Sequence, residues 1–300
     1  MKQEGFYVGE IYPEYDFYVT GASYTGRPVD NTIMFVTKKV EHLVQNLVGH
    51  HNCLVFAEVG IVVSDEIARD NAFVFSEQPQ REYIYFANMI YDEKRKRDIN
   101  RNFTLTEAGY YIGENVQIGK NAYIEPGCVI GHDVIIGDDA CILANAVIKN
   151  AIIGNKFVCN EGALIGTNGF TMAEDENGNK VRIPTLGKVC IGDCVEIGAN
   201  DNISCGSAGD TIIEDYVKLD VLVHVGHDAH LYKNVEITAC GIVGGFTELE
   251  ERAYMGLNAT TRNRIRLGKN CIIGMGATVT KSVDDNITVV GNPARPFEKK

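Results

Sequence analysis

Residues 112–137 read IGENVQIGKNAYIEPGCVIGHDVIIG, with an isoleucine at every sixth position from Ile112 to Ile136. Glycine follows most of these isoleucines. The same spacing continues to Val283, with slips and two interruptions, and gives about 25 six-residue units. Such periods are typical of a parallel β-helix in which three short flat strands make one coil. The sequence therefore predicts about eight stacked coils, with the aliphatic residue of each unit pointing inward.

Asparagine joins glycine beside the aliphatic positions, where each coil must turn a tight corner. Glycine adopts positive φ freely, and asparagine tolerates it better than most residues. The asparagines expected at such corners are Asn121, Asn145, Asn155, Asn160, Asn200 and Asn234. We interpret these residues as architectural and not as catalytic.

The first hundred residues do not repeat and predict a small α/β domain. Its expected elements are the strands Thr32–Val36, Cys53–Ala57 and Ala72–Phe75 and the helices at Lys38–Leu47 and from Pro79 onward. A charged stretch at 92–102 is expected to be a solvated connector to the repeats. The predicted organisation is therefore an α/β domain at 1–100, a β-helix at 101–285 and a tail at 286–300.

The composition is that of a soluble globular protein, with 45% hydrophobic and 23% charged residues. A formal net charge of -12 argues against nucleic acid or an anionic membrane as the main partner. From the first ten residues we expect no signal peptide, and the sequence contains no apolar run long enough for a membrane span. Its nine cysteines have no paired spacing, which indicates reduced thiols and a cytoplasmic location.

The repeat is interrupted at Thr167–Lys188 and again, more briefly, at Gly206–Asp210. We expect the longer interruption to be a structureless loop ejected from the coil, and loops of this length are more often functional than accidental. Because a protruding loop can reach a neighbouring subunit and the open coil faces need covering, we also expect a homotrimer.

Three of the seven histidines fall in one segment, at His224, His227 and His230. His227 follows a glycine at a turn position that is expected to point outward, where an exposed imidazole can act as a general base. A zinc site of the carbonic anhydrase kind would need a second histidine five residues later, where this chain has Tyr232. We therefore expect no metal.

Two motifs in and after the long interruption are distinctive: Arg182-Ile183-Pro184-Thr185 at the end of the loop and the stretch KLDVLVHVGH from Lys218 to His227. Both resemble motifs of the UDP-3-O-acylglucosamine N-acyltransferase family. The likeness is weaker in DNTIMFVTKK at 30–39, which is similar to the nucleotide-binding strand of that family and so implies a nucleotide-binding role for the domain at 1–100. The resemblance implies a left-handed β-helix trimer with active sites between subunits, in which His227 takes a proton from a sugar amine attacking a thioester.

The chain departs from this family at several positions. Phe35 of the nucleotide-binding turn is kept, but Lys38 and Glu41 replace the asparagine and aromatic residue that help to hold uracil. A second family histidine is replaced by Arg264. The ending VVGNPARP at 289–296 is similar to that of coenzyme-A-dependent acetyltransferases, whereas the family carries a helical tail that engages acyl carrier protein.

These observations predict an N-acyltransferase that transfers an acyl group from acyl-CoA to the amine of a UDP- or dTDP-linked amino sugar, with no permanently bound cofactor. The expected catalytic residues are His227 and Asp220. The expected substrate-binding residues are Phe35, Lys38, Phe170, Arg182 and His224. The expected donor-binding residues are Gly241, Gly244, Gly245, Lys281 and Arg295. The alternatives are a lipid A enzyme that uses acyl carrier protein and a non-catalytic β-helix binding module.

Overall fold

The computed structural model describes residues 5–297, which form two compact units. The first unit combines the N-terminal 99 residues with 170–187 and 207–209, and the second holds the remainder. The chain enters the second unit at Asn100, close to the expected boundary. The two interruptions of the repeat belong to the first unit, however, so neither unit is one continuous stretch of sequence.

The first unit is built on a parallel sheet in the order β3 (Gly21–Ala22), β4 (Thr32–Val36), β5 (Leu54–Glu58) and β6 (Ala72–Ser76). Because side chains alternate along a strand, the sheet fills two separate cores. One core joins Ile33, Leu54 and Phe56 to the long helix α2 (Pro79–Ile99), and the other joins Met34 and Val55 to the opposite layer. The α/β prediction is therefore correct for this unit.

Two details of the expected helices differ from the structure. The segment Lys38–Leu47 is a 3₁₀ helix (η2) with a kink at Val40, rather than an α-helix. Helix α2 continues to Ile99, so most of the expected charged connector is helical. Its charges form ion pairs one turn apart, such as Lys94 with Asp98 at 2.8 Å, and such pairs support an exposed helix.

The long interruption forms a hairpin and is not structureless. Strand β18 (Met172–Glu174) pairs antiparallel with β19 (Lys180–Arg182). The connecting turn is fixed by the Asp175 carboxylate, which accepts the backbone N–H groups of Asn177 and Asn179. Ile183 after the hairpin is only 8% exposed and packs in the α2 core. The hairpin is therefore an integral part of the first unit.

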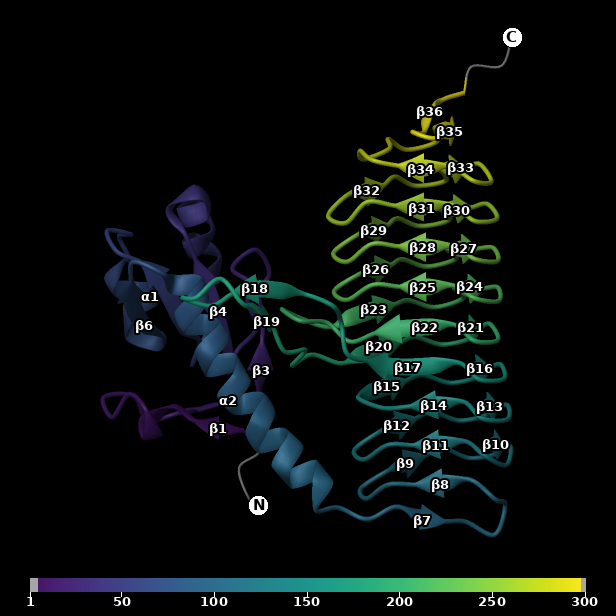
Figure 1. Ribbon diagram of the computed structural model, residues 1–300, viewed down its shortest axis with the longest axis horizontal. Helices are drawn as coiled ribbons and strands as arrows, with labels where there is room; N and C mark the ends of the chain where they lie inside the picture. Colours follow the sequence, from purple (N-terminus) through teal and green to yellow (C-terminus); the bar gives the residue numbers. More distant parts are fainter. Residues whose placement is uncertain (1–4, 298–300) are drawn as a thin grey trace. The chain divides into compact units, whose positions relative to one another are not determined.

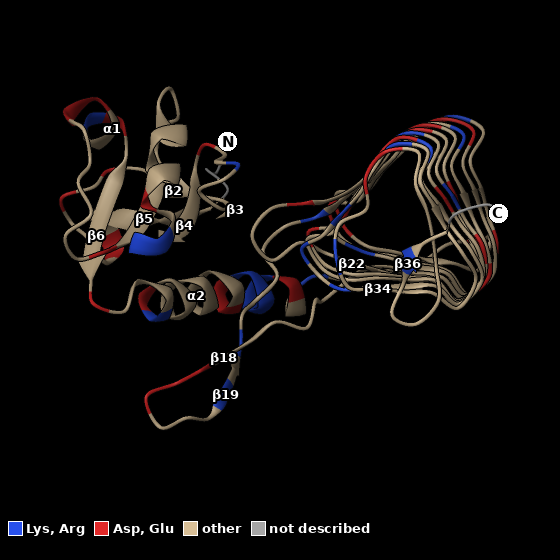
Figure 2. Cartoon of the chain, turned by 90° about the horizontal axis from the view of Figure 1, so that it is seen from above, with Lys and Arg blue, Asp and Glu red and all other residues tan. Residues whose placement is uncertain are grey.

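The second unit is a parallel β-helix with three faces, formed by sheets of ten, ten and eight strands (Figure 1). Each coil adds one short strand to each face, as in β25 (His224–Val225), β26 (His230–Leu231) and β27 (Glu236–Ile237). In the uninterrupted part the register advances by 18 residues per coil, since Glu236 pairs with Tyr254 and Tyr254 with Ile272. Viewed along the axis, the coils superpose as one triangular outline (Figure 2).

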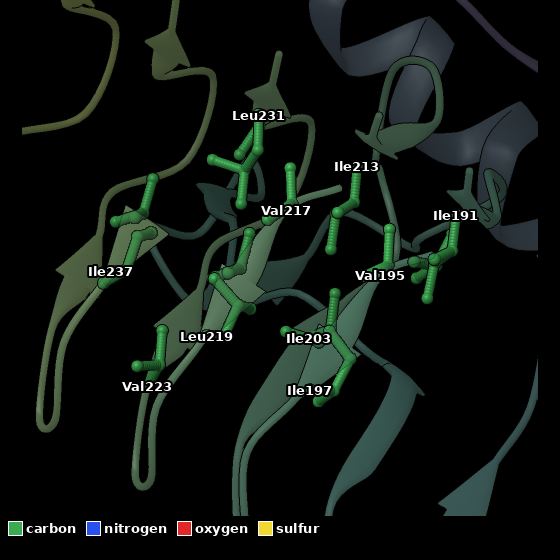
Figure 3. Close-up of a cluster of buried hydrophobic side chains, with 14 of the residues drawn as sticks. Ile191, Val195, Ile197, Ile203, Ile213, Val217, Leu219, Val223, Leu231 and Ile237 are labelled. Carbon is green, nitrogen blue, oxygen red and sulfur yellow. The ribbon is translucent and has the colours of Figure 1, made fainter. Parts of the chain in front are cut away.

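Aliphatic side chains fill the inside of the β-helix in columns, as the hexapeptide pattern predicts. Figure 3 shows Ile197, Leu219 and Ile237 among these inward side chains, and each is at most 3% exposed. Burying one side chain of this size contributes roughly 2 kcal/mol. Repetition over many coils makes this column the main source of stability of the unit.

The corners of the coils use the left-handed backbone region, but only partly at the expected residues. Asn121, Asn145, Asn200 and Asn234 have φ between 56° and 63°. Asn155 and Asn160 do not, and their side chains bond to neighbouring coils instead. Asn155 Oδ1 accepts from the backbone of Asp138, and Asn160 Nδ2 donates to the carbonyl of Ile197.

The C-terminal segment extends the β-helix instead of forming a separate tail. Strand β35 (Thr288–Val290) pairs with β33 (Ile272–Ile273), and β36 (Arg295–Pro296) adds antiparallel to β35 at the end of that sheet. Among the described residues, no helix is long and apolar enough to cross a membrane.

Candidate active site

His227 lies at a corner of the β-helix, two residues after β25. Its Nδ1 is 2.7 Å from Oδ2 of Asp228, whose side chain is only 5% exposed. Asp228 takes φ 58°, and its backbone N–H donates to Thr211 Oγ1. When the Asp228 carboxylate accepts a hydrogen bond from Nδ1–H, the free lone pair of the imidazole lies on Nε2. The pair has the composition and geometry of a general base with its orienting group.

The imidazole of His227 is more enclosed than the sequence suggests, with 16% of the side chain exposed. Glycines in the adjoining segments make room for it. A Cβ at Gly245 would stand 2.8 Å from Cε1 and Nε2 of the ring, and a Cβ at Gly169 would stand 2.9 Å from the His227 Cβ. A larger residue at either position would displace the histidine.

The other glycines expected to admit the donor have packing roles inside the β-helix. A Cβ at Gly244 would lie 2.6 Å from the backbone nitrogen of Asn263 in the next coil. A Cβ at Gly241 would lie 2.4 Å from a methyl group of Ile237. Stacking on the next coil therefore explains glycine at Gly244, and the tight turn after β27 explains it at Gly241. Of the three glycines expected to admit the donor, Gly245 is the one that borders the imidazole.

Asp220, the other residue predicted to be catalytic, bonds elsewhere than to the imidazole. The Asp220 carboxylate accepts the backbone N–H groups of Val221 at 2.8 Å and Ala239 at 3.1 Å, so it braces a corner. Asp228 is the carboxylate that contacts the imidazole. The sequence held a signal for it, because Asp228 directly follows His227 at a corner position where aspartate tolerates positive φ.

The two neighbouring histidines have distinct surroundings. Burial lowers the pKa of His224, and the electrostatic effect of the nearby His227 lowers it further. His230 Nε2 lies 2.8 Å from Glu214 Oε1, and its ring stacks on Tyr232 with centroids 3.8 Å apart. Within residues 5–297 no group of three or more His, Cys, Asp and Glu side chains is placed to hold a metal ion.

The first unit contains a cleft of about 590 Å³ at the carboxyl edge of its parallel sheet. Thr37 after β4, Glu58 at the end of β5 and Arg81 in the first turn of α2 line one part of it. Met172 and Lys180 of the hairpin line another. Ligands of α/β sheets bind at this edge, beyond the carboxyl ends of the strands.

The residues predicted to bind substrate in this unit lie around the cleft and not in its lining. Phe35 packs against Tyr83, with ring centroids 5.2 Å apart. The backbone N–H of Lys38 donates to Glu58 at 2.8 Å. Phe170 is 76% exposed, and the Arg182 guanidinium lies 5.2 Å from its ring centre. Thr37, which lies between Phe35 and Lys38 in sequence, is the residue of that turn that borders the cleft.

The two cations predicted to bind the donor are both exposed on the second unit. Lys281 follows strand β34 (Thr278–Val279), and Arg295 lies in β36, where its guanidinium donates to the carbonyl of Ala294. These positions do not identify a ligand for Lys281 or Arg295, and donor binding by the two residues stays a prediction.

Comparison with known proteins supports the assignment of the repeats. The family described as bacterial transferase hexapeptide (six repeats) matches residues 109–137 and 115–150, and the hexapeptide repeat of succinyl-transferase matches 247–281. A UDP-3-O-acylglucosamine N-acyltransferase of Caulobacter sp. (strain K31) is 37% identical over 155 residues, covering 52% of this chain and 45% of that protein. One of Herminiimonas arsenicoxydans is 34% identical over 175 residues, covering 58% and 45%.

The chain is a hexapeptide-repeat protein that resembles the UDP-3-O-acylglucosamine N-acyltransferases. It spans less than half the length of these curated relatives. The UDP-N-acetylglucosamine acyltransferase of Bacteroides fragilis 9343 superposes with a TM-score of 0.57 at 26% identity, over 65% of this chain and 74% of that one. The Campylobacter jejuni enzyme gives 0.58 at 20% identity, with the same coverage. These matches establish the left-handed parallel β-helix fold of the hexapeptide-repeat protein.

Proposed function

We propose that this hexapeptide-repeat protein is an N-acyltransferase that acylates the amine of a nucleotide-linked amino sugar. The observation that carries the proposal is the His227–Asp228 pair, enclosed at a corner of the β-helix with Nδ1 held 2.7 Å from the carboxylate. The resemblance to N-acyltransferases of a UDP-sugar indicates the class of acceptor. The cleft of the first unit, with Thr37, Arg81 and Lys180 in its lining, is the proposed site for the nucleotide.

In the proposed reaction the sugar amine attacks the carbonyl carbon of a thioester and forms a C–N bond. His227 Nε2 takes the proton that the amine nitrogen loses, and Asp228 stabilises the resulting imidazolium. The C–S bond then breaks, and the imidazolium returns the proton to the departing thiolate. The products are an amide and a free thiol, with His227 neutral again.

The tetrahedral intermediate needs a hydrogen-bond donor for its oxyanion. The backbone N–H groups of Gly244 and Gly245 are two candidates, and they differ in whether they already donate to a protein acceptor. The N–H of Gly244 already donates to Thr261 Oγ1 at 2.9 Å. The N–H of Gly245 donates to no protein acceptor in the part of the chain that the structure describes. We therefore place the oxyanion contact at Gly245. Such a hydrogen bond typically lowers the activation free energy by about 3 kcal/mol.

The donor we propose is acyl-CoA. The sequence VVGNPARP at the end of the β-helix supports it, because that sequence is similar to coenzyme-A-dependent acetyltransferases. An acyl chain carried by acyl carrier protein is the alternative, and it is the donor that the family resemblance of the repeat region implies.

The test measures thiol release with acetyl-CoA, longer acyl-CoAs and acyl carrier protein thioesters against UDP- and dTDP-linked amino sugars. We expect release with at least one acyl-CoA, and a His227→Ala variant with kcat lowered by about 10²–10⁴. His42→Ala removes an exposed histidine of the first unit and is the control, with turnover unchanged. Near-normal turnover by His227→Ala would refute the general base. Nucleotide binding without thiol release from any pair would instead identify a binding module.

A further inference from the structure

One corner of the β-helix stacks a charged and aromatic column directly beside His227. Asp228, Phe246 and Arg264 are 18 residues apart and occupy the same corner position in three successive coils, with φ of 58°, 57° and 59°. Most corners elsewhere carry asparagine, aspartate or another polar residue in this conformation. Phenylalanine is costly there, because a bulky side chain disfavours positive φ.

The aromatic ring of Phe246 connects the histidine to the arginine. It stands edge-on to His227, with centroids 5.3 Å apart and an interplanar angle of 90°. The Arg264 guanidinium lies over the same ring, with its Cζ 3.9 Å from the ring centre. Stacking of this kind holds the guanidinium flat and pre-orients its hydrogen-bond donors. A fixed cation therefore lies one side chain away from the base.

Arg264 has no carboxylate partner among the described residues, although the protein is strongly acidic. Its neighbour Arg266 is paired twice, with Glu250 and Asp285 at 2.9 Å each. Arg264 is exposed and forms no ion pair with any residue in 5–297. In a chain of net charge -12, a stacked and unpaired arginine beside the candidate base is suited to an anion from outside the protein.

We propose that Arg264 determines specificity by binding an anionic group, a phosphate or a carboxylate, of the amine-bearing substrate. The inference rests on the proposed function in one respect, namely that the amine lies at His227. The two short ring distances restrict the anion to a position a few bonds from that amine. The phosphates of acyl-CoA are too remote to match this requirement, because they lie at the far end of the pantetheine arm from the thioester.

Isothermal titration with Arg264→Asn tests the proposal, because asparagine tolerates the corner backbone and removes only the charge and the stacking. UDP-glucosamine supplies a phosphate, 2-amino-2-deoxyglucuronic acid supplies a carboxylate, and methyl glucosaminide supplies neither. We expect the Kd of one or both acidic probes to rise by about tenfold to a hundredfold, the usual effect of losing a charge-assisted hydrogen bond. Methyl glucosaminide and acetyl-CoA should bind as to the unmodified protein.

Arg252→Ala is the matched control, because Arg252 is also an exposed corner arginine, with φ 60°, but lies at another edge of the β-helix. Its affinities should be unchanged. The proposal is overturned if no acidic probe binds the unmodified protein. It is also overturned if Arg264→Asn changes the Kd of both acidic probes by less than twofold, or if the substitution weakens the binding of acetyl-CoA alone. Anion binding that depends on Arg264 without any thiol release would refute acyl transfer and keep the anion site.

Discussion

At the scale of single residues, His227 depends on its neighbour in sequence for orientation and on distant glycines for space. Asp228 fixes the imidazole because the corner turns the two side chains toward each other. Gly245 leaves room for the ring although it is 18 residues away. The sequence indicates His227 as a candidate base, whereas the glycines that leave room for its ring, Gly169 and Gly245, come from other coils.

Asp228→Asn should lower kcat by about tenfold to a thousandfold. The amide can donate to Nδ1 and so favour the tautomer in which Nε2 carries the proton and cannot accept one. Asp139→Asn is the matched control, because Asp139 occupies the same backbone conformation at a distant corner, with φ 59°. Steady-state kinetics on both variants would measure the effect, and equal activity of the two variants would show that the carboxylate does not support His227.

A second residue-scale prediction concerns the buried Asp201. This carboxyl is fully buried and accepts the backbone N–H groups of Gly198 and Val223. Burial outweighs these bonds and raises its pKa to about 7 from 3.8. Between these values the folded protein binds the proton more tightly than the unfolded chain, so this group's contribution to stability falls as pH rises from about 4 to 7.

Asp201→Asn should remove that contribution while leaving the rest of the pH dependence in place. We expect the difference in melting temperature between the unmodified protein and the variant to shift in favour of the variant as pH rises from 4 to 7. Thermal unfolding followed by circular dichroism at several pH values would measure the difference. A difference that stays constant over this range would contradict the raised pKa.

At the scale of elements, the hairpin β18–β19 is a structure that the local sequence does not predict. The break in the hexapeptide pattern located the insertion correctly, but its length suggested a loop without structure. The short strands and the Asp175 turn are weak local signals, and Ile183 becomes informative only when the α2 core is known. Similarly, Tyr83 of α2 donates to the carbonyl of Ser207, a contact that no local pattern predicts.

Ile183→Ala should destabilise the first unit by roughly 2–4 kcal/mol, because it leaves a cavity in a core that also contains Phe86 and Leu54. The hairpin should then be cut faster by protease around 175–179. Val62→Ala removes a side chain that is 87% exposed in the same unit and should change neither quantity. Thermal unfolding with limited proteolysis would show the contrast. Equal behaviour of the two variants would mean that the hairpin does not stabilise the unit.

At the scale of the whole molecule, the β-helix presents apolar side chains on its outer faces. Ile135, Ile152, Leu164 and Ile242 are each 37–41% exposed. These exposed apolar residues support the homotrimer that the sequence predicts. Their outward position is fixed by the inward position of the aliphatic columns, since side chains alternate along each strand.

Sedimentation equilibrium should therefore give a mass near three times the 33.0 kDa of one chain. The association should resist added salt, because apolar contacts are little screened. Ile152→Glu, on one of these faces, should shift the equilibrium toward single chains without altering the inward columns. A mass of one chain at micromolar concentration for the unmodified protein would contradict the trimer.

The sequence by itself determined the β-helix, the α/β nature of the N-terminal unit, the position of the interruptions and His227 as the candidate base. It could do so because these features are periodic or local, and a six-residue repeat allows one efficient way to bury its aliphatic residues. Tertiary structure decided which carboxylate contacts the imidazole of His227, that the hairpin belongs to the first unit, and that Phe246 and Arg264 stack beside His227. The physical reason is that folding joins residues that are distant in sequence: the 18-residue coil places residues from separate repeats in contact at one corner, and the α2 core holds Ile183 after the hairpin.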